Sequence, residues 1–514
     1  MLSILLSLSA SNVLLLAIAA PFLLAIFQYV SDPLRAVPGP RLARYTRLWY
    51  LYKIYQGQFE KVNIGLHQRY GPVVRIAPNE YSIDDVAAAK TIYGHGNSFV
   101  KAPWYRAWMP PDPSQASLFA DLDPHHHSLQ RRKFASAYSM TSLMSYEPYV
   151  NNCLSLFITR FSEIARSGRS VDFAHWFQCY AFDVIGEITF GRRFGFLDGG
   201  IDGEDVFGAI ESRTAYSTYV GMFPMLHDVL FHLLPRSGGH GFVGSYTRTR
   251  IASREQDLNK PELPEKNIKG PEDFVSKFLR IRAEDPGKMT NADIFTMCQS
   301  NIGAGSDTTA ITLSSILYHL LQHPTTHKRL QAELDEGIGS GAISSPITFK
   351  EANQLPYLQA VIKEALRLHP ATGLPLARIV PSTGASIAGY NFPSGATVGI
   401  NSWVAHHNTS IFGDDAGSWR PERWLEFQEQ GRGAEVEKYF FAFGMGGRTC
   451  VGRNLSLLEV GKLIPEIVRR FEFVMDGGEV SGVGWKSISR WFVKPVEFEG
   501  RVSERNGKWK MDDM

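Results

Sequence analysis

The sequence predicts a mainly α-helical fold with a small β portion, preceded by one N-terminal transmembrane helix. Three observations lead to this prediction. Apolar residues recur at three- and four-residue spacing over several long segments, strand-like segments are few, and residues 2–30 contain no charged residue and no histidine. With 514 residues, 44% of them hydrophobic, and no Pro/Ser-rich linker or internal repeat, the chain is expected to form one large body.

The N-terminal segment is the predicted membrane anchor. A spanning helix needs about 20 largely apolar residues, and residues 2–30 meet that length. Basic residues such as Arg35 and Arg41 follow the segment while none precedes it, so the rest of the chain is expected in the cytosol. We therefore divide the chain into a membrane anchor with its hinge approach, residues 1–35, and one cytosolic domain, residues 36–514.

A cleaved signal peptide is the alternative interpretation of the same segment. Ala17-Ile18-Ala19 offers a small-residue cleavage site, but the basic region that opens a signal peptide is missing and the apolar run continues beyond the site. We expect the anchor to be retained as a single membrane pass.

Short strands and long helices are expected at definite places along the chain. Residues 73–83 are typical of two strands around a Pro-Asn turn, and residues 385–400 of further strands broken at residues 393–395. Gly and Ser predict a surface loop over residues 236–245. Apolar spacing predicts helices at residues 143–166, 174–190, 291–322, 357–369 and 454–471.

Charge and cysteine usage exclude several classes of function. Lys plus Arg number 53 against 51 Asp plus Glu, and the resulting net charge of +2 offers no general attraction to nucleic acid. The four cysteines are widely spaced and form no CxxC motif, unlike a disulfide framework or a zinc site. Adjacent residues do not share a helix face, so the run His125-His126-His127 is not expected to form a separate metal site.

A glycine-rich segment that ends at Gly452 carries the strongest chemical signal. Glycines let a backbone take positive φ and approach a flat ligand closely. A helix is predicted directly after Cys450, and the N-terminus of a helix stabilises a thiolate, which is a strong iron donor. For Cys450 taken alone, an ordinary buried cysteine is the alternative. The segment reads Phe443-Gly444-Met445-Gly446-Gly447-Arg448-Thr449-Cys450-Val451-Gly452.

This decapeptide resembles the haem-binding signature of the cytochrome P-450 family, FGxGxRxCxG, and matches it at every defined position. The resemblance implies the cytochrome P-450 fold and a haem b, iron protoporphyrin IX, whose iron takes Cys450 as its axial thiolate. Phe443 and Arg448 belong to the same cofactor-binding loop. In this family the thiolate pushes electron density onto the iron and so favours O–O cleavage. Residues 36–514 would then be a haem-thiolate catalytic domain.

The segment Ala304 to Thr309 lies in the middle of the predicted helix 291–322. Gly303 and Gly305 each cost roughly 1 kcal/mol against Ala inside a helix, so they need a reason. Close packing against another helix is one explanation. The other is that the segment resembles the oxygen-binding groove of the same family, (A/G)Gx(D/E)TT. By that resemblance Thr308 hydrogen-bonds the bound dioxygen and Asp307 supplies protons through water, and the two are the catalytic residues.

A third group of residues is structural by resemblance. Glu364 and Arg367 form an ExxR pattern on a predicted helix, which alone says little because such pairs are common. Later in the chain, the segment Pro421 to Trp424 resembles the PERF segment of the family with Trp in place of Phe. The resemblance implies that Arg423 joins Glu364 and Arg367 in a triad behind the cysteine loop.

The two propionates of a haem need cationic partners, and a guanidinium group binds a carboxylate in a bidentate manner. Arg448 in the cysteine loop and Arg378 after the ExxR helix are candidates. Arg131 is a third, because His127 and Arg131 resemble the WxxxR helix of the family, with His127 in place of Trp. These residues are the predicted cofactor-binding set together with Phe443 and Cys450.

The resemblance implies a monooxygenase that inserts one atom of dioxygen into a lipophilic small molecule. Aromatic and aliphatic residues are frequent in the segments that would face the substrate, such as residues 95–120, although the same residues could simply fill a core. A second resemblance, to pisatin demethylase-like fungal enzymes, rests on residues 454–471 and 489–494 and indicates secondary metabolite biosynthesis.

The expected partners follow from the same resemblance. The chain extends only to residue 514 beyond Cys450, too short for a flavin domain, so electrons are expected from NADPH–cytochrome P-450 reductase. Both proteins would then sit in the endoplasmic reticulum membrane, in contact with membrane lipid. Two other functions remain open: a haem-thiolate isomerase or dehydratase that does not use dioxygen, and a non-catalytic haem sensor or electron carrier.

Overall fold

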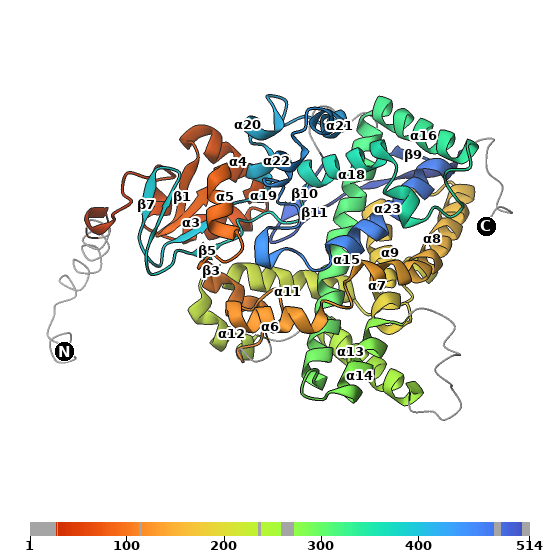
Figure 1. The fold of residues 1–514 in the computed structure, drawn as a ribbon, viewed down its shortest axis with the longest axis horizontal. Helices are drawn as coiled ribbons and strands as arrows, with labels where there is room; N and C mark the ends of the chain where they lie inside the picture. The colour runs from red at the N-terminus through yellow and green to blue at the C-terminus, as the bar shows by residue number, and fades with distance from the viewer. Residues whose placement is uncertain are drawn as a thin grey trace, which may run out of the picture.

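A computed structural model describes residues 27, 29–112, 116–234, 238–258, 272–476 and 485–505. Over these residues helices dominate and the strands are short, so the predicted fold class, mainly α with a small β portion, is confirmed (Figure 1). The predicted anchor lies almost entirely outside the described residues. Among the described helices, none has the length and the apolar character needed to span a membrane.

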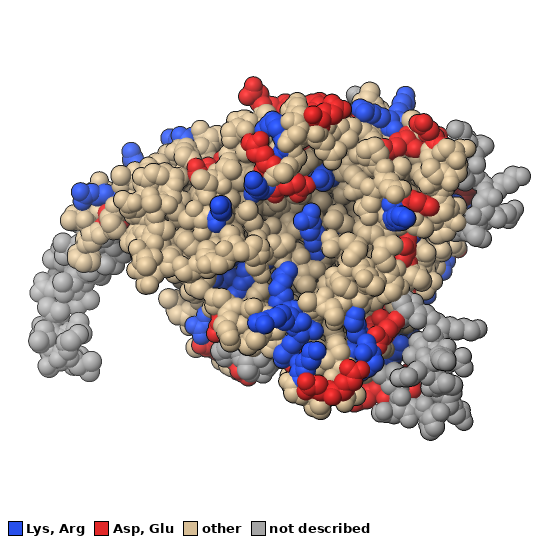
Figure 2. Space-filling view, viewed as in Figure 1, with Lys and Arg blue, Asp and Glu red and all other residues tan. Residues whose placement is uncertain are grey.

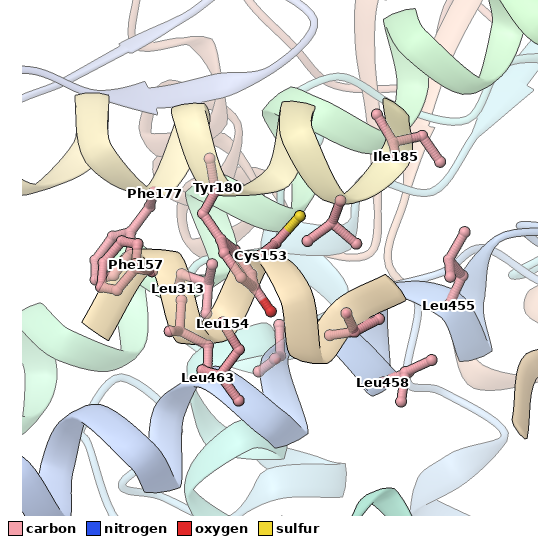
Figure 3. Close-up of a cluster of buried hydrophobic side chains, with 14 of the residues drawn as sticks. Cys153, Leu154, Phe157, Phe177, Tyr180, Ile185, Leu313, Leu455, Leu458 and Leu463 are labelled. Carbon is pink, nitrogen blue, oxygen red and sulfur yellow. The ribbon is translucent and has the colours of Figure 1, made fainter. Parts of the chain in front are cut away.

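Four helices form the centre of the helical body. They are α8 (Glu147–Ser167), α9 (Phe173–Phe190), α15 (Asn291–Gln322) and α23 (Arg453–Arg470). Figure 3 shows their apolar side chains meeting in one cluster, with Phe157 of α8, Tyr180 of α9, Leu313 of α15 and Leu458 of α23 among them. All four residues are fully buried. The predicted helices at 174–190, 291–322 and 454–471 correspond to three of these elements.

Helix α15 crosses the whole body and packs chiefly on α9 (Figure 1). It begins as predicted, because Thr290 and Asp293 form a reciprocal capping box in which each side chain accepts from the backbone N–H of the other residue. The helix runs unbroken to Gln322, just before Pro324. A central element of this length places residue 307 deep inside the protein.

The largest sheet lies beside the helical body and has the strand order β1-β2-β8-β5-β3. Strands β1 (Val73–Ala77) and β2 (Glu80–Ile83) flank the predicted Pro-Asn turn, where Asn79 adopts φ 55°. β2 pairs in parallel with β8 (Thr397–Gly399), and the sheet is completed by two strands, β5 (Arg378–Ile379) and β3 (Val100–Lys101). Both predicted strand regions are therefore confirmed.

Three smaller sheets complete the β portion. A hairpin of β10 and β11 reaches toward α15, and its tip carries Arg490 to Phe492. The strands of these sheets are β4 (Val171–Asp172), β6 (Ala385–Ile387), β7 (Tyr390–Phe392), β9 (Phe471–Met475), β10 (Ser487–Ser489), β11 (Val493–Pro495) and β12 (Glu499–Glu504).

The remaining helices cover the core and the sheets. The predicted surface loop over residues 236–245 is wrong, since α13 starts at Gly238 and packs on α11 and α15, so that tertiary contacts outweigh the low helix propensity of glycine. In the N-terminal half these helices are η1 (Leu42–Arg44), α3 (Leu48–Tyr55), α4 (Phe59–Tyr70), α5 (Val86–Tyr93), η2 (Pro103–Trp108), α6 (Pro124–Phe134), α7 (Met140–Ser145), α10 (Phe196–Gly199), α11 (Val206–Val220), η4 (Pro224–Leu226), α12 (His227–Leu233) and α13 (Gly238–Leu258). In the C-terminal half they are α14 (Phe274–Glu284), α16 (Pro324–Gly339), α17 (Phe349–Ala352), α18 (Pro356–Leu368), α19 (Ser402–His406), α20 (Thr409–Phe412), α21 (Glu422–Glu429), α22 (Gly433–Glu437) and η6 (Gly446–Arg448).

Candidate functional site

The glycine-rich loop before α23 is held in one shape. Gly446 has φ 66°, and a Cβ atom there would lie 1.8 Å from the carbonyl oxygen of Tyr93, so both conformation and space require glycine. The backbone N–H of Cys450 donates to the carbonyl oxygen of Phe443 at 2.9 Å, which closes the loop. The loop thus fixes the position of a single sulfur atom.

Cys450 differs from the other three cysteines, which are fully buried, because its side chain is open to a pocket of about 340 Å³. Protein packed around the rest of the residue raises the pKa of the Cys450 thiol, and the N–H groups of Gly452 and Arg453, together with the Arg131 guanidinium, act in the opposite direction. The predicted stabilisation of a thiolate by the start of the helix is therefore present, but its effect on the pKa of Cys450 is smaller than that of burial. A thiolate here needs a further cation, such as a metal ion bound to the sulfur. The pocket is lined by Arg131, Ala135, Tyr138, Thr449, Cys450, Val451, Arg453 and Asn454.

Four cationic side chains gather beside this loop, and among the described residues their hydrogen bonds go to backbone carbonyl groups. Arg131 donates to the carbonyl oxygen of Thr449 at 2.8 Å and Arg448 to that of Asp121 at 2.8 Å. Arg378 donates to the carbonyl groups of Leu376 and Ala377 in its own segment, and Lys101 donates to that of Phe119. Within the described part of the chain, no carboxylate forms an ion pair with any of the four.

The charges of this cationic group act strongly on one another. Burial, then Arg448, Lys101, Arg131 and Arg378, lower the pKa of His127 to about 3. Burial, then Arg378 and Arg448, place the pKa of Lys101 well below its usual range. Burial and Arg378 also lower the pKa of Arg448 to about 10. Buried cations in such number require anions, and the two propionates of a haem b fit this donor set.

Thr308 and its turn of α15 show a partly open helix face. Ala304 is exposed, a Cβ at Gly303 would meet no atom within 4 Å, and the Thr308 hydroxyl donates to the carbonyl oxygen of Ala304 at 2.8 Å. On another face, a Cβ at Gly305 would lie 3.3 Å from the Ile185 side chain of α9. Close helix packing, one of the two explanations for these glycines, therefore accounts for Gly305, whereas no neighbouring atom crowds Gly303.

Asp307 is buried and held by two side chains from other elements. Its Oδ1 accepts a hydrogen bond from Gln178 Nε2 of α9 at 2.6 Å. Its Oδ2 lies 2.9 Å from Lys494 Nζ of β11, an ion pair without hydrogen-bond geometry. The Lys494 side chain is 22% exposed, whereas the Asp307 side chain is 0% exposed. The buried carboxylate of Asp307 is thus in contact with a side chain, Lys494, that itself reaches the solvent.

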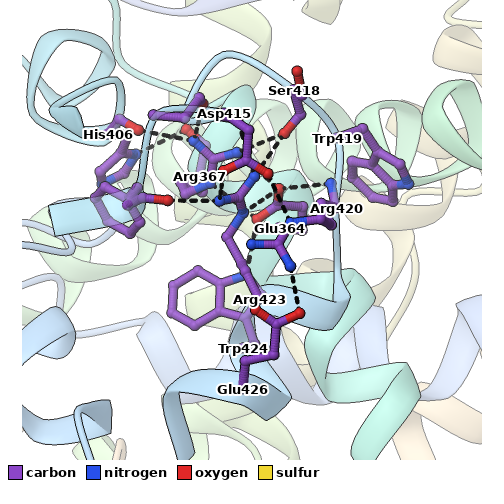
Figure 4. Close-up of polar contacts among 12 residues, drawn as sticks. Glu364, Arg367, His406, Asp415, Ser418, Trp419, Arg420, Arg423, Trp424 and Glu426 are labelled. Atoms are coloured by element: carbon purple, nitrogen blue, oxygen red, sulfur yellow. Dashed lines mark hydrogen bonds and ion pairs between the residues drawn. The ribbon is translucent and has the colours of Figure 1, made fainter. Parts of the chain in front are cut away.

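The structure brings the predicted structural triad together (Figure 4). Arg367 donates through Nε and a terminal nitrogen to the two oxygens of Glu364 at 2.9 and 2.7 Å, and Arg423 donates to Glu364 at 3.0 Å. The three side chains are fully buried. Trp424 donates its indole N–H to the same carboxylate at 2.9 Å, so the Trp that replaces Phe in the PERF-like segment takes part in the network.

The predicted site residues fall into three groups. Cys450, Phe443, Arg448, Arg131, Arg378 and His127 lie together, Glu364, Arg367 and Arg423 form the triad, and Asp307 and Thr308 lie on α15. Sequence reasoning missed Lys101, Gln178 and Lys494. Lys494 stands in a segment already singled out, but no spacing rule connects it with residue 307.

Comparisons with known proteins give a consistent result. The family model described as Cytochrome P450 matches residues 38–482. A pisatin demethylase from Fusarium vanettenii is 39% identical over 485 residues, which cover 93% of this chain and 92% of that protein. Cytochrome P450 monooxygenase cicH from Emericella nidulans is 37% identical over 479 residues, 92% of this chain and 95% of that protein. Cytochrome P450 monooxygenase gsfF from Penicillium aethiopicum is 32% identical over 504 residues, 94% of this chain and 98% of that protein.

Proposed function

Because this chain belongs to the cytochrome P450 family of haem-thiolate oxidoreductases, we propose that it is a monooxygenase that oxidises a lipophilic small molecule in fungal secondary metabolism. Bound haem b with a cysteine thiolate supplies the activation of dioxygen, of which one atom enters the substrate and the other leaves as water. Hydroxylation, epoxidation and related oxidations all fit this chemistry.

Cys450 carries the proposal. It is the one cysteine open to the pocket, and the cationic group of Arg131, Arg378, Arg448 and Lys101 lies beside its loop. In this assignment Cys450 would hold the haem iron through its sulfur, these cations would bind the propionates, and His127 would be a further hydrogen-bonding partner. Phe443 holds the loop through its carbonyl group. The triad of Glu364, Arg367 and Arg423 supports the fold and takes no part in the chemistry.

We assign proton delivery to Asp307 and Thr308. The reduction of one oxygen atom to water consumes two protons, and a hydroxyl beside a carboxylate suits their transfer. Thr308 faces the open side of α15, while Asp307 connects through Lys494 to solvent. In this arrangement a proton enters at the Asp307 carboxylate and passes through water to the Thr308 hydroxyl.

The electron donor is proposed to be NADPH–cytochrome P-450 reductase. Figure 2 shows Lys and Arg side chains gathered in the middle of the face on which α6 lies. The last turn of α6 carries Arg131, Arg132 and Lys133, but Lys133 pairs with Asp293 at 2.9 Å and Arg131 binds Thr449. The exposed Arg132 is therefore the best placed of the three to meet an acidic donor.

We further propose that residues 1–35 anchor the chain in the endoplasmic reticulum membrane, with residues 36–514 as the cytosolic catalytic domain. Large exposed apolar side chains support a bilayer contact. Tyr55 of α3 is 72% exposed, and Met225 and Leu233 near α12 are 75% and 71% exposed. Tyr55 also lies against Tyr219 of α11, with ring centroids 6.1 Å apart. Replacing Met225 and Leu233 by Ser should weaken binding to phosphatidylcholine vesicles, whereas Ile201→Ser should not.

Oxygen uptake tests the proposed activity against its alternatives. The purified protein, reconstituted with the reductase and NADPH, should consume dioxygen, with 7-ethoxycoumarin as a general probe substrate. A haem-thiolate isomerase or dehydratase, or a non-catalytic haem protein, would show neither NADPH oxidation nor oxygen uptake above the reductase alone. That result, with normal haem content, would reject the monooxygenase proposal.

A further inference from the structure

Five aromatic side chains from three separate segments meet in one cluster. Trp104, Tyr105 and Trp108 come from η2, Phe119 from the segment before α6, and Trp491 from the tip of the β10–β11 hairpin. Their ring centroids are 5.0 to 6.3 Å apart, with tilted and edge-to-face geometry. This is the range in which aromatic rings attract one another. We call these five residues the aromatic cluster.

The aromatic cluster contacts one member of the cationic group and shares an apolar cluster with a residue of α15. The Lys101 ammonium lies 4.2 Å from the ring centroid of Tyr105 and 4.6 Å from that of Phe119. Ile311 of α15, one turn beyond Thr308, belongs to the same apolar cluster as Trp104 and Trp491. The rings therefore adjoin Lys101, which is assigned above to cofactor binding, and pack in one apolar cluster with the part of α15 that follows Thr308.

Polar contacts hold the aromatic cluster against α11. The Trp104 indole N–H donates to the carbonyl oxygen of Thr218 at 3.2 Å. The Ser217 hydroxyl donates to the carbonyl oxygen of Ala107 in η2 at 2.9 Å. Beside Trp491, Arg490 donates to the hydroxyl of Tyr219 and forms an ion pair with Glu211. The rings are thus fixed in position before any ligand arrives, which lowers the entropic cost of binding.

Two features distinguish the aromatic cluster from ordinary core filling. Phe119 is 36% exposed and Trp108 is half-buried, so the rings are not sealed in the interior. The Trp108 Nε1 atom is itself buried and has no acceptor among the described residues. A buried indole N–H nearly always has a partner, because leaving it unpaired is costly. This donor, among aromatic faces, calls for a ligand that brings an acceptor.

We propose that the aromatic cluster binds the substrate, and that the substrate is a planar aromatic molecule with a hydrogen-bond acceptor that takes the Trp108 N–H. This inference rests on the proposed monooxygenase function and names its substrate class. A flat ring that lies against these side chains makes ring–substrate contacts of the same kind as the ring–ring contacts within the cluster. A saturated ring system of the same size cannot do so.

Matched ligands test the aromatic preference in the haem-loaded, full-length protein. Naphthalene and decahydronaphthalene share one carbon skeleton, and burial of apolar area alone favours the saturated compound, which has the larger apolar surface. The aromatic cluster reverses this order, and we expect naphthalene to bind roughly tenfold more tightly, as two or three ring contacts allow. Dissociation constants come from the ferric spin-state absorbance shift and, independently, from quenching of tryptophan fluorescence.

Variants separate the rings from the indole donor. In the wild type, 2-methoxynaphthalene should bind several-fold more tightly than naphthalene. Trp108→Phe should abolish this difference, but it should keep the preference for naphthalene over decahydronaphthalene. Trp491→Leu should reduce that preference. Trp419→Phe is the matched control, because Trp419 stacks on His319, outside the aromatic cluster, and it should change neither result.

Two outcomes would overturn the inference. The first is that the wild type binds decahydronaphthalene as tightly as naphthalene or more tightly. The second is that Trp491→Leu keeps the full preference for naphthalene and Trp108→Phe keeps the tighter binding of 2-methoxynaphthalene. If the ferrous–CO spectrum and oxygen uptake remain normal in that case, only the substrate class is wrong. If the haem signals are absent, the proposed function fails, and fluorescence quenching still reports on the aromatic preference.

Discussion

The carboxylate of Asp307 and the ammonium of Lys494 lie 2.9 Å apart, and they join the central helix α15 to the C-terminal hairpin. The carboxylate side chain is 0% exposed, and Gln178 occupies its second oxygen. Asp307 therefore rests with both oxygens engaged, while the Thr308 hydroxyl donates to its own helix. The proton delivery proposed for Asp307 and Thr308 therefore requires at least one of these contacts to open.

Lys494→Gln should lower the free energy of unfolding, and it should lower the fraction of consumed dioxygen that is used for substrate oxidation. Removing one partner of a buried ion pair leaves an uncompensated charge, which costs about 3–5 kcal/mol, somewhat less here because Lys494 is partly exposed. We expect a lower free energy of unfolding in urea and a larger share of consumed dioxygen released as peroxide. Lys494→Arg should restore both. Lys486→Gln, at an exposed pair on the same hairpin, should resemble the wild type. Unchanged peroxide release in Lys494→Gln would contradict this role.

Glu364→Gln should destabilise the protein strongly without changing its chemistry. The substitution leaves Arg367 and Arg423 buried without a carboxylate between them, at a cost of about 3–5 kcal/mol. Glu163→Gln is the matched control, because Glu163 is half exposed and pairs with Arg160 at the surface. Removing this pair should lower the free energy of unfolding by only about 0–1 kcal/mol. Urea unfolding measures both. A loss below 1 kcal/mol in Glu364→Gln would show that the triad is not a structural centre.

Lys101→Met should have opposite effects on the two forms of the protein. Without haem, the variant removes a buried cation from a group of like charges, so the apoprotein should be at least as stable as the wild type. With haem, it removes a propionate partner, and haem should be lost several-fold faster to an excess of a haem-scavenging protein. Arg132→Gln, an exposed change on α6, should leave haem loss unchanged. Equal haem loss in wild type and Lys101→Met would exclude Lys101 from the cofactor site.

The stability should fall as the pH drops from 6.5 toward 3, in part through His406. The backbone N–H of Phe441 donates to His406 Nε2 at 2.8 Å, so Nδ1 carries the proton and donates to the carbonyl oxygen of Arg367. Burial lowers the pKa of His406 to about 3. Over this range the unfolded chain takes up a proton that the folded protein does not, which favours unfolding.

His406→Gln should therefore reduce the pH dependence of stability by up to about 1.4 kcal/mol per pH unit between pH 6 and pH 4. The variant is also expected to be less stable at pH 7, because one of two buried hydrogen bonds is weakened. His125→Gln, on the exposed start of α6, is the control for the slope. An identical slope in wild type and His406→Gln would mean that His406 titrates normally in the folded protein.

The sequence predicted the elements that local patterns specify. Helix α15 matches its predicted bounds because apolar spacing and the Thr290–Asp293 cap act within the segment itself. The loop glycines were predicted to permit positive φ and close approach to a flat ligand. Gly446 does have φ 66°, but the group that it approaches closely is the carbonyl of Tyr93. The helix at 238–258 was missed because packing on α11 and α15 outweighs glycine propensity.

In the candidate site, too, the sequence predicted only residues that stand in local motifs. Resemblance supplied Cys450 and Asp307, since each stands in a motif of adjacent residues. Lys101 and Lys494 stand in ordinary strand segments, and only the tertiary arrangement of β3 and β11 brings them to the site. Their contribution depends on burial and on neighbouring charges, which a sequence pattern does not encode.

The most direct test of haem-thiolate ligation by Cys450 is the ferrous–CO difference spectrum of the purified protein beside that of Cys450→Ser. Ligation of the haem iron by the Cys450 thiolate would shift the Soret band of the CO complex strongly to the red, and we expect this band in the wild type and its loss in the variant. Identical spectra in the two proteins, or a wild type that binds no haem, would show that Cys450 is not a thiolate ligand of haem.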